Sequence, residues 1–141
     1  MSILIQKFGG TSMGNIERIE RAADIIIKTK NSGDQVVVVV SAMAGETDRL
    51  IHLAKSMALV PHSREYSALI STGEQVSAAL LSICLEKKGY KARSFTGAQA
   101  GILTDSQYEK ARIIHIDETP LREALAQDFI PVVAGFQGAD K

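Results

Sequence analysis

A lysine, two glycines and two hydroxyl residues form the first group that could do chemistry, KFGGTS at residues 7–12, directly after the apolar run Ile3–Gln6. Glycines let a backbone approach phosphate oxygens, and the start of a following helix offers free N–H groups with a partial positive charge. Lys7 adds a mobile cation, and Thr11 and Ser12 add hydroxyls. Because the lysine precedes the glycines, the pattern is neither a Walker A loop nor a GxGxxG fingerprint. It favours a phosphate-binding turn over a simple reversal of the chain.

A second group follows five consecutive valines, Val36–Val40, and begins at Ser41. If the strands ending near Lys7 and Val40 are neighbours, Ser41 is expected beside Lys7 at the same edge of the sheet. The alternative is that Ser41 is a loop hydroxyl or a helix cap. Thr47, at the start of the next predicted helix, is either a cap of that helix or a ligand-binding hydroxyl.

The third group, STGEQ at residues 71–75, interrupts an otherwise apolar helical stretch with polar groups and a glycine. Such an interruption is costly in a buried helix. One interpretation is a capping arrangement of Ser71 and Thr72 ahead of Glu74. The other is that Glu74 projects toward the strand ends, where its carboxylate binds an ammonium group or orients the attacking group.

The elements that would position these groups alternate between strands and helices, which predicts an α/β fold. The valine run is too short for a helix and apolar on both faces, so it predicts a mainly parallel sheet between two helical layers, a three-layer αβα sandwich. Strands are predicted over Ile3–Gln6, Val36–Val40, Lys91–Phe95, Arg112–Ile116 and Ile130–Ala134. Helices are predicted over Asn15–Lys30, Thr47–Ala58, Arg64–Lys88 with an interruption near residues 71–73, and Pro120–Gln127.

Composition excludes several other classes of function. The 141 residues fit one domain, and 16 Lys+Arg balance 16 Asp+Glu, so no positive field draws nucleic acid or an anionic membrane. The unbroken apolar runs are short, and no leader peptide is recognisable, so we expect a cytoplasmic protein. Cys84 is the single cysteine and is expected in the core, and His52, His62 and His115 lack metal-ligand spacing. We therefore expect no metal site built from the protein's own side chains.

Five motifs, in this order, resemble the aspartate kinase family within the amino acid kinase superfamily: KFGGTS (7–12), VVSAM (39–43), STGEQVSAALLS (71–82), SFTGAQAGILT (94–104) and VVAGFQG (132–138). The resemblance covers essentially the whole chain. It implies an amino acid kinase-like fold and transfer of the γ-phosphate of ATP to the side-chain carboxylate of L-aspartate. The product, 4-phospho-L-aspartate, leads to lysine, threonine, methionine and diaminopimelate. The resemblance also implies ATP as cofactor, Mg²⁺ carried with the nucleotide, and a homo-oligomer.

Carried over residue by residue, the resemblance assigns the phosphate side of the site to the first two groups. It implies that Lys7 holds the transferred phosphate and that Phe8, Gly9 and Gly10 supply backbone contacts to ATP. It places Ser41 beside the phosphates and the substrate.

The same resemblance assigns the amino acid side of the site to Thr47 and Glu74, with Glu74 meeting the ammonium group of aspartate. Lys7 and Glu74 are then the catalytic residues. In phosphoryl transfer the protein mostly positions two anions and neutralises developing charge. The attacking carboxylate is already ionised, so no general base is needed.

Family members continue after GFQG into a nucleotide-binding part and C-terminal ACT regulatory domains. Residues 1–141 are therefore expected to be the N-terminal part of a catalytic domain, nearly inactive alone, with an exposed sheet edge that favours self-association. One alternative is another kinase of the same fold, acting on acetylglutamate, glutamate, carbamate or UMP. Another is a non-catalytic truncated domain used for interaction.

Overall fold

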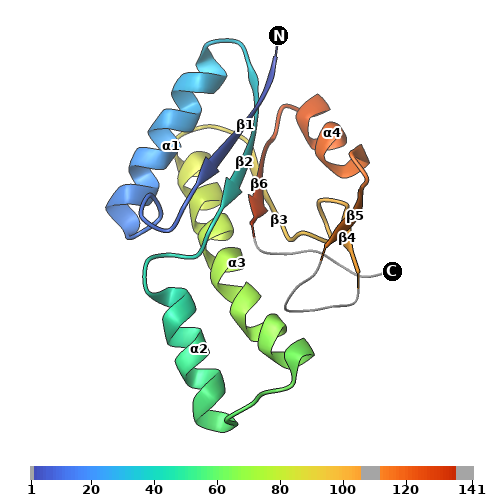
Figure 1. Cartoon of the computed structure of the whole chain (residues 1–141). Coiled ribbons are helices and arrows are strands. Elements are labelled where there is room, and N and C mark those ends of the chain that lie inside the picture. The colour runs from blue at the N-terminus through green and yellow to red at the C-terminus, as the bar shows by residue number, and fades with distance from the viewer. Residues whose placement is uncertain (1, 106–111, 136–141) are drawn as a thin grey trace.

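A four-stranded parallel sheet lies between helices on both faces (Figure 1). The computed structural model describes residues 2–105 and 112–135. In spatial order, the strands are β1 (Ile3–Phe8), β2 (Gln35–Val40), β6 (Ile130–Ala134) and β3 (Ala92–Phe95). The helices are α1 (Ile16–Asn31), α2 (Glu46–Met57), α3 (Ser63–Lys87) and α4 (Thr119–Ala126). A separate antiparallel ribbon consists of β4 (Ile102–Thr104) and β5 (Ile113–Ile116).

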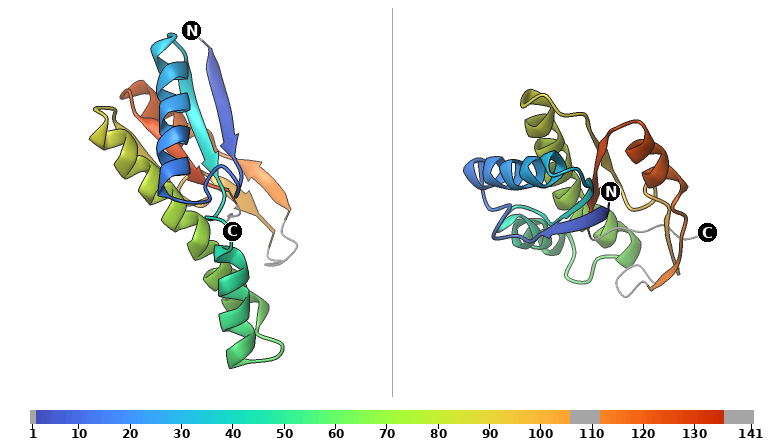
Figure 2. Two further views of the ribbon diagram at one scale, coloured as in Figure 1. Left: turned by 90° about the vertical axis from the view of Figure 1, so that its left-hand side faces the viewer. Right: turned by 90° about the horizontal axis from the view of Figure 1, so that it is seen from above.

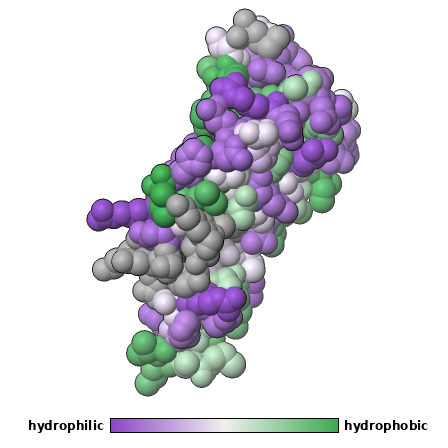
Figure 3. Space-filling view, turned by 90° about the vertical axis from the view of Figure 1, so that its right-hand side faces the viewer, coloured by the Kyte–Doolittle hydropathy of each residue, from purple (hydrophilic) through white to green (hydrophobic). Residues whose placement is uncertain are grey.

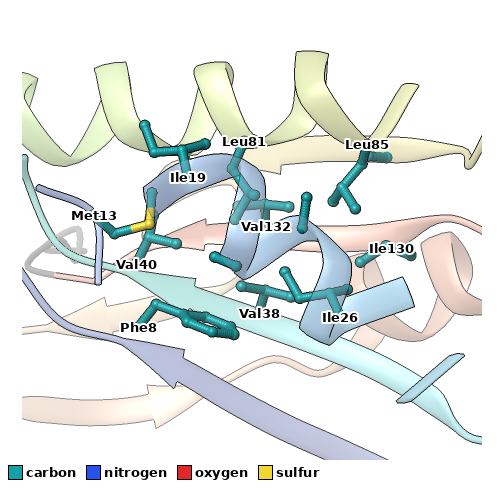
Figure 4. Packing of buried hydrophobic residues seen from close by; sticks show 14 of the residues in the cluster. Phe8, Met13, Ile19, Ile26, Val38, Val40, Leu81, Leu85, Ile130 and Val132 are labelled. Carbon is teal, nitrogen blue, oxygen red and sulfur yellow. The ribbon is translucent and has the colours of Figure 1, made fainter. Parts of the chain in front are cut away.

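The valine run forms β2, between β1 and β6, and its side chains alternate between the two faces of the sheet. Val36, Val38 and Val40 belong to the core cluster that α1 and α3 cover, and Figure 4 shows Val38 and Val40 within it. Val37 and Val39 pack in a second cluster with residues of α4. The predicted parallel sheet with helices on each face, and hence the α/β sandwich, is confirmed.

The first βαβ unit agrees closely with the sequence-based expectation. The N-cap of α1 is Asn15, whose Oδ1 accepts a hydrogen bond of 2.9 Å from the backbone N–H of Arg18. Ile19 and Ile26 are buried against the sheet, which secures the helix over β1 and β2. The parallel register pairs Lys7 with Val39.

Helix α3 runs for 25 residues without interruption, so the predicted break near residues 71–73 is wrong. The hydroxyls of Ser71 and Thr72 donate to the backbone carbonyls of Ala68 and Leu69, at 3.0 and 2.6 Å. They bond backward along a helix that is already formed, so the proposed capping arrangement ahead of Glu74 is also wrong. The actual N-cap is His62.

Among the described residues, α3 is the one helix that is long and apolar enough to cross a membrane, with a mean hydropathy of 1.4. This judgement rests on length and composition alone. Polar residues divide this helix, so it contains no long unbroken apolar run. Core helices of globular proteins pass the same test, and the buried side of α3 includes Glu74, Ser77 and Ser82. Figure 2 shows α3 lying along the sheet and continuing beyond it as a hairpin with α2.

The predicted strand at residues 112–116 exists as β5, but it lies outside the main sheet. It pairs with β4, a strand that the sequence did not predict. All four β5 residues are exposed, with Ile113 at 60%. Apolar β-branched residues therefore indicated a strand here but not its place.

Candidate functional site at the carboxyl edge of the sheet

Two loops meet where β1 and β2 end. The backbone N–H of Ser41 donates to the carbonyl of Phe8 at 3.1 Å, so the two backbone segments stay paired for one residue beyond β2. A Cβ placed on Gly10 would lie 3.7 Å from the carbonyl oxygen of Ala42. The expected proximity of the backbones at Lys7 and Ser41 is therefore confirmed.

The loop after β1 is a compact turn whose middle faces open space. Among the described residues, no atom outside the turn lies within 4 Å of the position that a Cβ would take on Gly9. Met13, fully buried beside Val40 (Figure 4), donates its N–H to the carbonyl of Gly9 at 3.0 Å. Helix α1 begins at Ile16, close to the predicted start at Asn15, so several residues separate its N-terminus from Gly9 and Gly10. Room for an anion therefore lies over the glycine turn itself.

Lys7 and Phe8 leave β1 on opposite faces of the sheet. The Phe8 side chain belongs to the core cluster under α1 and α3, so Phe8 could contact a ligand only through its backbone. Lys7 is exposed and pairs with Val39, whose side chain packs toward α4. The Lys7 amine therefore starts on the face opposite α3, at the carboxyl end of its strand.

Gly73 brings α3 against the loop that follows β2. A Cβ on Gly73 would lie 3.0 Å from the Cβ of Ala42, 3.4 Å from Cδ1 of Leu50 and 3.5 Å from Cγ of Glu46. Glu74 is the next residue of the helix, so this contact places its backbone beside the strand ends. In the sequence, Gly73 had indicated only an interruption of the helix. A small residue within an apolar helical stretch was the signal of a close contact.

Glu74 carries the most unusual carboxyl group of this region. Its side chain is buried, with 7% of the residue exposed, and Oε2 has no hydrogen-bond partner in the described part of the chain. Burial raises the pKa of the Glu74 carboxyl above its ordinary value because the charged form loses its water. Buried carboxylates are normally paired, so this oxygen is suited to accept hydrogen bonds from a cationic ligand.

Thr47 lies in the first turn of α2 and is half-buried. It does not cap the helix, because the N-cap is Gly45 in a left-handed conformation, with φ at 79° and no side-chain cap. Beside it, Arg49 Nε and an Arg49 terminal nitrogen hold the two oxygens of Glu46 at 3.0 and 2.6 Å. These hydrogen bonds lower the pKa of Glu46. The start of α2 thus combines the half-buried hydroxyl of Thr47 with a carboxylate, Glu46, that is already bonded to Arg49.

The remaining titratable residues of interest lie away from this edge. No group of three or more His, Cys, Asp and Glu residues within 2–105 and 112–135 gathers closely enough to hold a metal ion. Cys84 packs partly buried against the main core cluster, as predicted, and burial raises the pKa of its thiol. His52 and His115 are exposed. Of the motif at residues 132–138, the part beyond Gly135 lies outside the described residues.

A sequence model of the Amino acid kinase family matches residues 2–141. The chain belongs to the amino acid kinase family. This amino acid kinase is 55% identical to the aspartokinase of Pseudomonas aeruginosa over 140 residues, which cover 99% of the chain and 34% of that relative. It is 54% identical to the aspartokinase of Geobacillus stearothermophilus over 138 residues, with 98% and 34% covered. The chain therefore spans about a third of the length of these curated relatives.

Solved structures confirm the amino acid kinase-like fold. The aspartate kinase from Synechocystis superimposes with a TM-score of 0.80 at 45% identity, over 96% of this chain and 22% of that one. E. coli aspartokinase III in complex with aspartate and ADP gives a TM-score of 0.84 over 100% of this chain and 42% of that one. At 20% identity, this second likeness shows the fold alone.

Proposed function

We propose that this chain forms the aspartate- and phosphate-binding part of an aspartate kinase. The proposed reaction transfers the γ-phosphate of ATP to the side-chain carboxylate of L-aspartate and gives 4-phospho-L-aspartate, an early intermediate of lysine, threonine, methionine and diaminopimelate biosynthesis in the cytoplasm. One observation carries the assignment of the acceptor: within the described residues the buried carboxylate of Glu74 has an oxygen without a hydrogen-bond partner, and its neighbour Gly73 contacts the loop that follows β2. Identity above 50% to aspartokinases supports it.

In this proposal the amino acid lies across the carboxyl edge of the sheet, with its ammonium group on Glu74. Thr47 contacts the same substrate from the first turn of α2. That turn suits an anionic group because its N-cap, Gly45, has no side chain that could occupy the free N–H groups. The side-chain carboxylate of the substrate then extends toward β1 and β2, where it attacks as an ion and needs no base.

The phosphate side consists of Lys7, Phe8, Gly9, Gly10 and Ser41. The open space over Gly9 fits an anion, and Lys7 brings a positive charge to the same strand end. Mg²⁺, carried with the nucleotide, supplies further neutralisation of charge when ATP is bound. Since the chain spans about a third of its relatives, we expect these 141 residues alone to bind aspartate and to turn over little.

Calorimetric titration of this chain with L-aspartate and with succinate tests the proposal. Succinate lacks the ammonium group, so Glu74→Gln should weaken aspartate binding at least tenfold, the size of effect that loss of a charge-assisted hydrogen bond produces, and change succinate binding little. Glu86→Gln, an exposed position on the same helix, is the matched control. Absence of aspartate binding by the wild-type chain, or equal affinity in Glu74→Gln, contradicts the proposal.

The alternative acceptors differ in a way that Glu74 can distinguish. Acetylglutamate, carbamate and UMP have no free ammonium group, so a buried unpaired carboxylate does not suit them. Glutamate retains the ammonium group and differs from aspartate by one methylene. A panel of these acceptors with a full-length relative should rank aspartate first, and a preference for any acceptor without an ammonium group would favour the alternative. A non-catalytic domain would bind none of them.

A further inference from the structure

We propose that the contact between Gly73 and Ala42 sets the position of Glu74 at the strand ends, which makes Gly73 a positioning residue for the amino acid substrate. This inference rests on the proposed function, because it concerns the same site. It adds a residue that touches no substrate and acts only through its neighbour in the helix.

Packing, and not backbone conformation, explains the glycine at this position. Gly73 lies inside α3 and is not among the glycines with positive φ, so an alanine could adopt the same backbone. Glycine in a helix interior is less stable than alanine. The compensating feature is the contact itself: a Cβ on Gly73 would lie only 3.0 Å from that of Ala42, closer than about nine in ten Cβ contacts in proteins.

Ala42 connects this helix contact to the phosphate side of the site. It is buried, with 4% exposed, and it follows Ser41 directly. Its carbonyl oxygen lies 3.7 Å from the Cβ position of Gly10. One small residue therefore lies between α3 and the glycine turn after β1. A longer distance between Gly73 and Ala42 would therefore move Glu74 away from the loop after β2 and from the glycine turn after β1.

An added methyl group at residue 73 has little space to move into. Besides Ala42, it would meet Cδ1 of Leu50 at 3.4 Å and Cγ of Glu46 at 3.5 Å. Both belong to α2, so the methyl group is enclosed from the loop and from the neighbouring helix. The contact with Ala42 requires a relative shift of a few tenths of an ångström, which we expect α3 to make. Because α3 is continuous, Glu74 moves with it.

Exchanging the two residues provides the test. Gly73→Ala adds the methyl group to the helix side of the contact, and Ala42→Gly removes it from the loop side. The double variant Ala42→Gly/Gly73→Ala carries one methyl group at the contact, as the wild type does. Gln75→Ala, an exposed position beside Glu74, is the control for a new alanine in this turn of α3.

Two readouts are measured on all five proteins: calorimetric affinity for L-aspartate, and the pKa of Glu74 from the ¹³C shift of its carboxyl group. We expect Gly73→Ala to weaken aspartate binding about fivefold, since displacements well below 1 Å at a binding group cost less than the roughly hundredfold loss that 1 Å can cause. Its Glu74 pKa should fall toward the ordinary value as water enters. The double variant should recover both, and Gln75→Ala should change neither.

The outcomes separate this inference from the proposed function. If the wild-type chain binds no aspartate, the proposed function fails, and the Glu74 pKa of the variants still decides the contact. If Gly73→Ala does not fold, a folded double variant with wild-type readouts supports the inference. Wild-type affinity and Glu74 pKa in Gly73→Ala, or a double variant no better than that single variant, would overturn it.

Discussion

Replacing Glu74 by glutamine should stabilise the protein at neutral pH even though it removes the proposed ammonium partner. The Glu74 side chain is buried and Oε2 has no partner in the part of the chain that the structure describes, so the folded state holds a carboxylate with incomplete solvation. A buried group left unsatisfied costs about 1–3 kcal/mol. Glutamine has nearly the same shape without the charge, and we expect it to recover about 1 kcal/mol of that cost. For a chain of this size, this gain corresponds to an increase in Tm of about 3–5 °C.

The stability difference between wild type and Glu74→Gln should depend on pH. Burial raises the pKa of Glu74 in the folded state above its ordinary value of 4.5, so the folded protein holds the proton more tightly than the unfolded chain. The stability contributed by the protonated group is complete below the unfolded pKa and is lost as pH rises through the folded pKa. The advantage of Glu74→Gln should therefore be small near pH 4 and larger at pH 7.

Urea denaturation of wild type, Glu74→Gln and the exposed control Glu86→Gln at both pH values measures this difference in the free energy of unfolding. Glu86→Gln should show no such change with pH. A Glu74→Gln protein that is less stable than wild type at pH 7, or equally shifted at both pH values, would refute the reasoning from burial.

Three further variants test the elements around the site. Asn15→Ala should lower the free energy of unfolding by about 1 kcal/mol, because its Oδ1 caps the N–H of Arg18; an unchanged urea midpoint would contradict the cap. Val38→Ala should lower the same free energy by about 2–3 kcal/mol, because Val38 is fully buried in a central strand; a loss below 1 kcal/mol would argue against close packing there. Ile5→Lys, on the exposed edge strand β1 and 72% exposed, should change stability by less than about 0.5 kcal/mol. It should also reduce any self-association seen in sedimentation velocity, and undiminished association would exclude the β1 edge as its cause.

Side-chain type was sufficient to predict the strands of the main sheet. The final strand, Ile130–Ala134, was predicted with its observed bounds, and β2 differs by one residue. Apolar β-branched runs have few alternatives to a buried strand. The carboxyl ends of parallel strands share one edge, so Ser41 was expected near Lys7 on the condition that their strands are neighbours, which the pairing of β1 with β2 meets.

Contacts between distant segments decided the features that the sequence did not predict. Gly73 and its polar neighbours suggested a break in α3, but the contact with Ala42 makes glycine suitable in a continuous helix. The ribbon of β4 and β5 depends on pairing two short exposed strands, which local periodicity does not reveal. The face on which Lys7 leaves the sheet depends on the register with Val39.

Exposed apolar residues also gather at the turn between α2 and α3, where the local sequence does not predict exposure. Met57, Leu59 and Val60 are 87%, 91% and 90% exposed at the tip of the hairpin of α2 and α3. Figure 3 shows this apolar surface at the lower end of the molecule, away from the sheet. A helical hairpin can place a turn well beyond the core, so hydrophobic residues there are not buried by the fold itself.

The position of β6 affects the order in which this protein can fold. β6 is the last described strand along the chain, yet it lies between β2 and β3. Within the described sheet, β3 has hydrogen-bonded register only with β6, so its partner is synthesised some thirty-five residues later. During translation, the first half of the sheet can pair as soon as β2 emerges. The second half has to wait for Ile130–Ala134, so until then β3 and the sheet-facing side of α3 lack their partner strand β6, a stage at which partly folded chains are prone to aggregation.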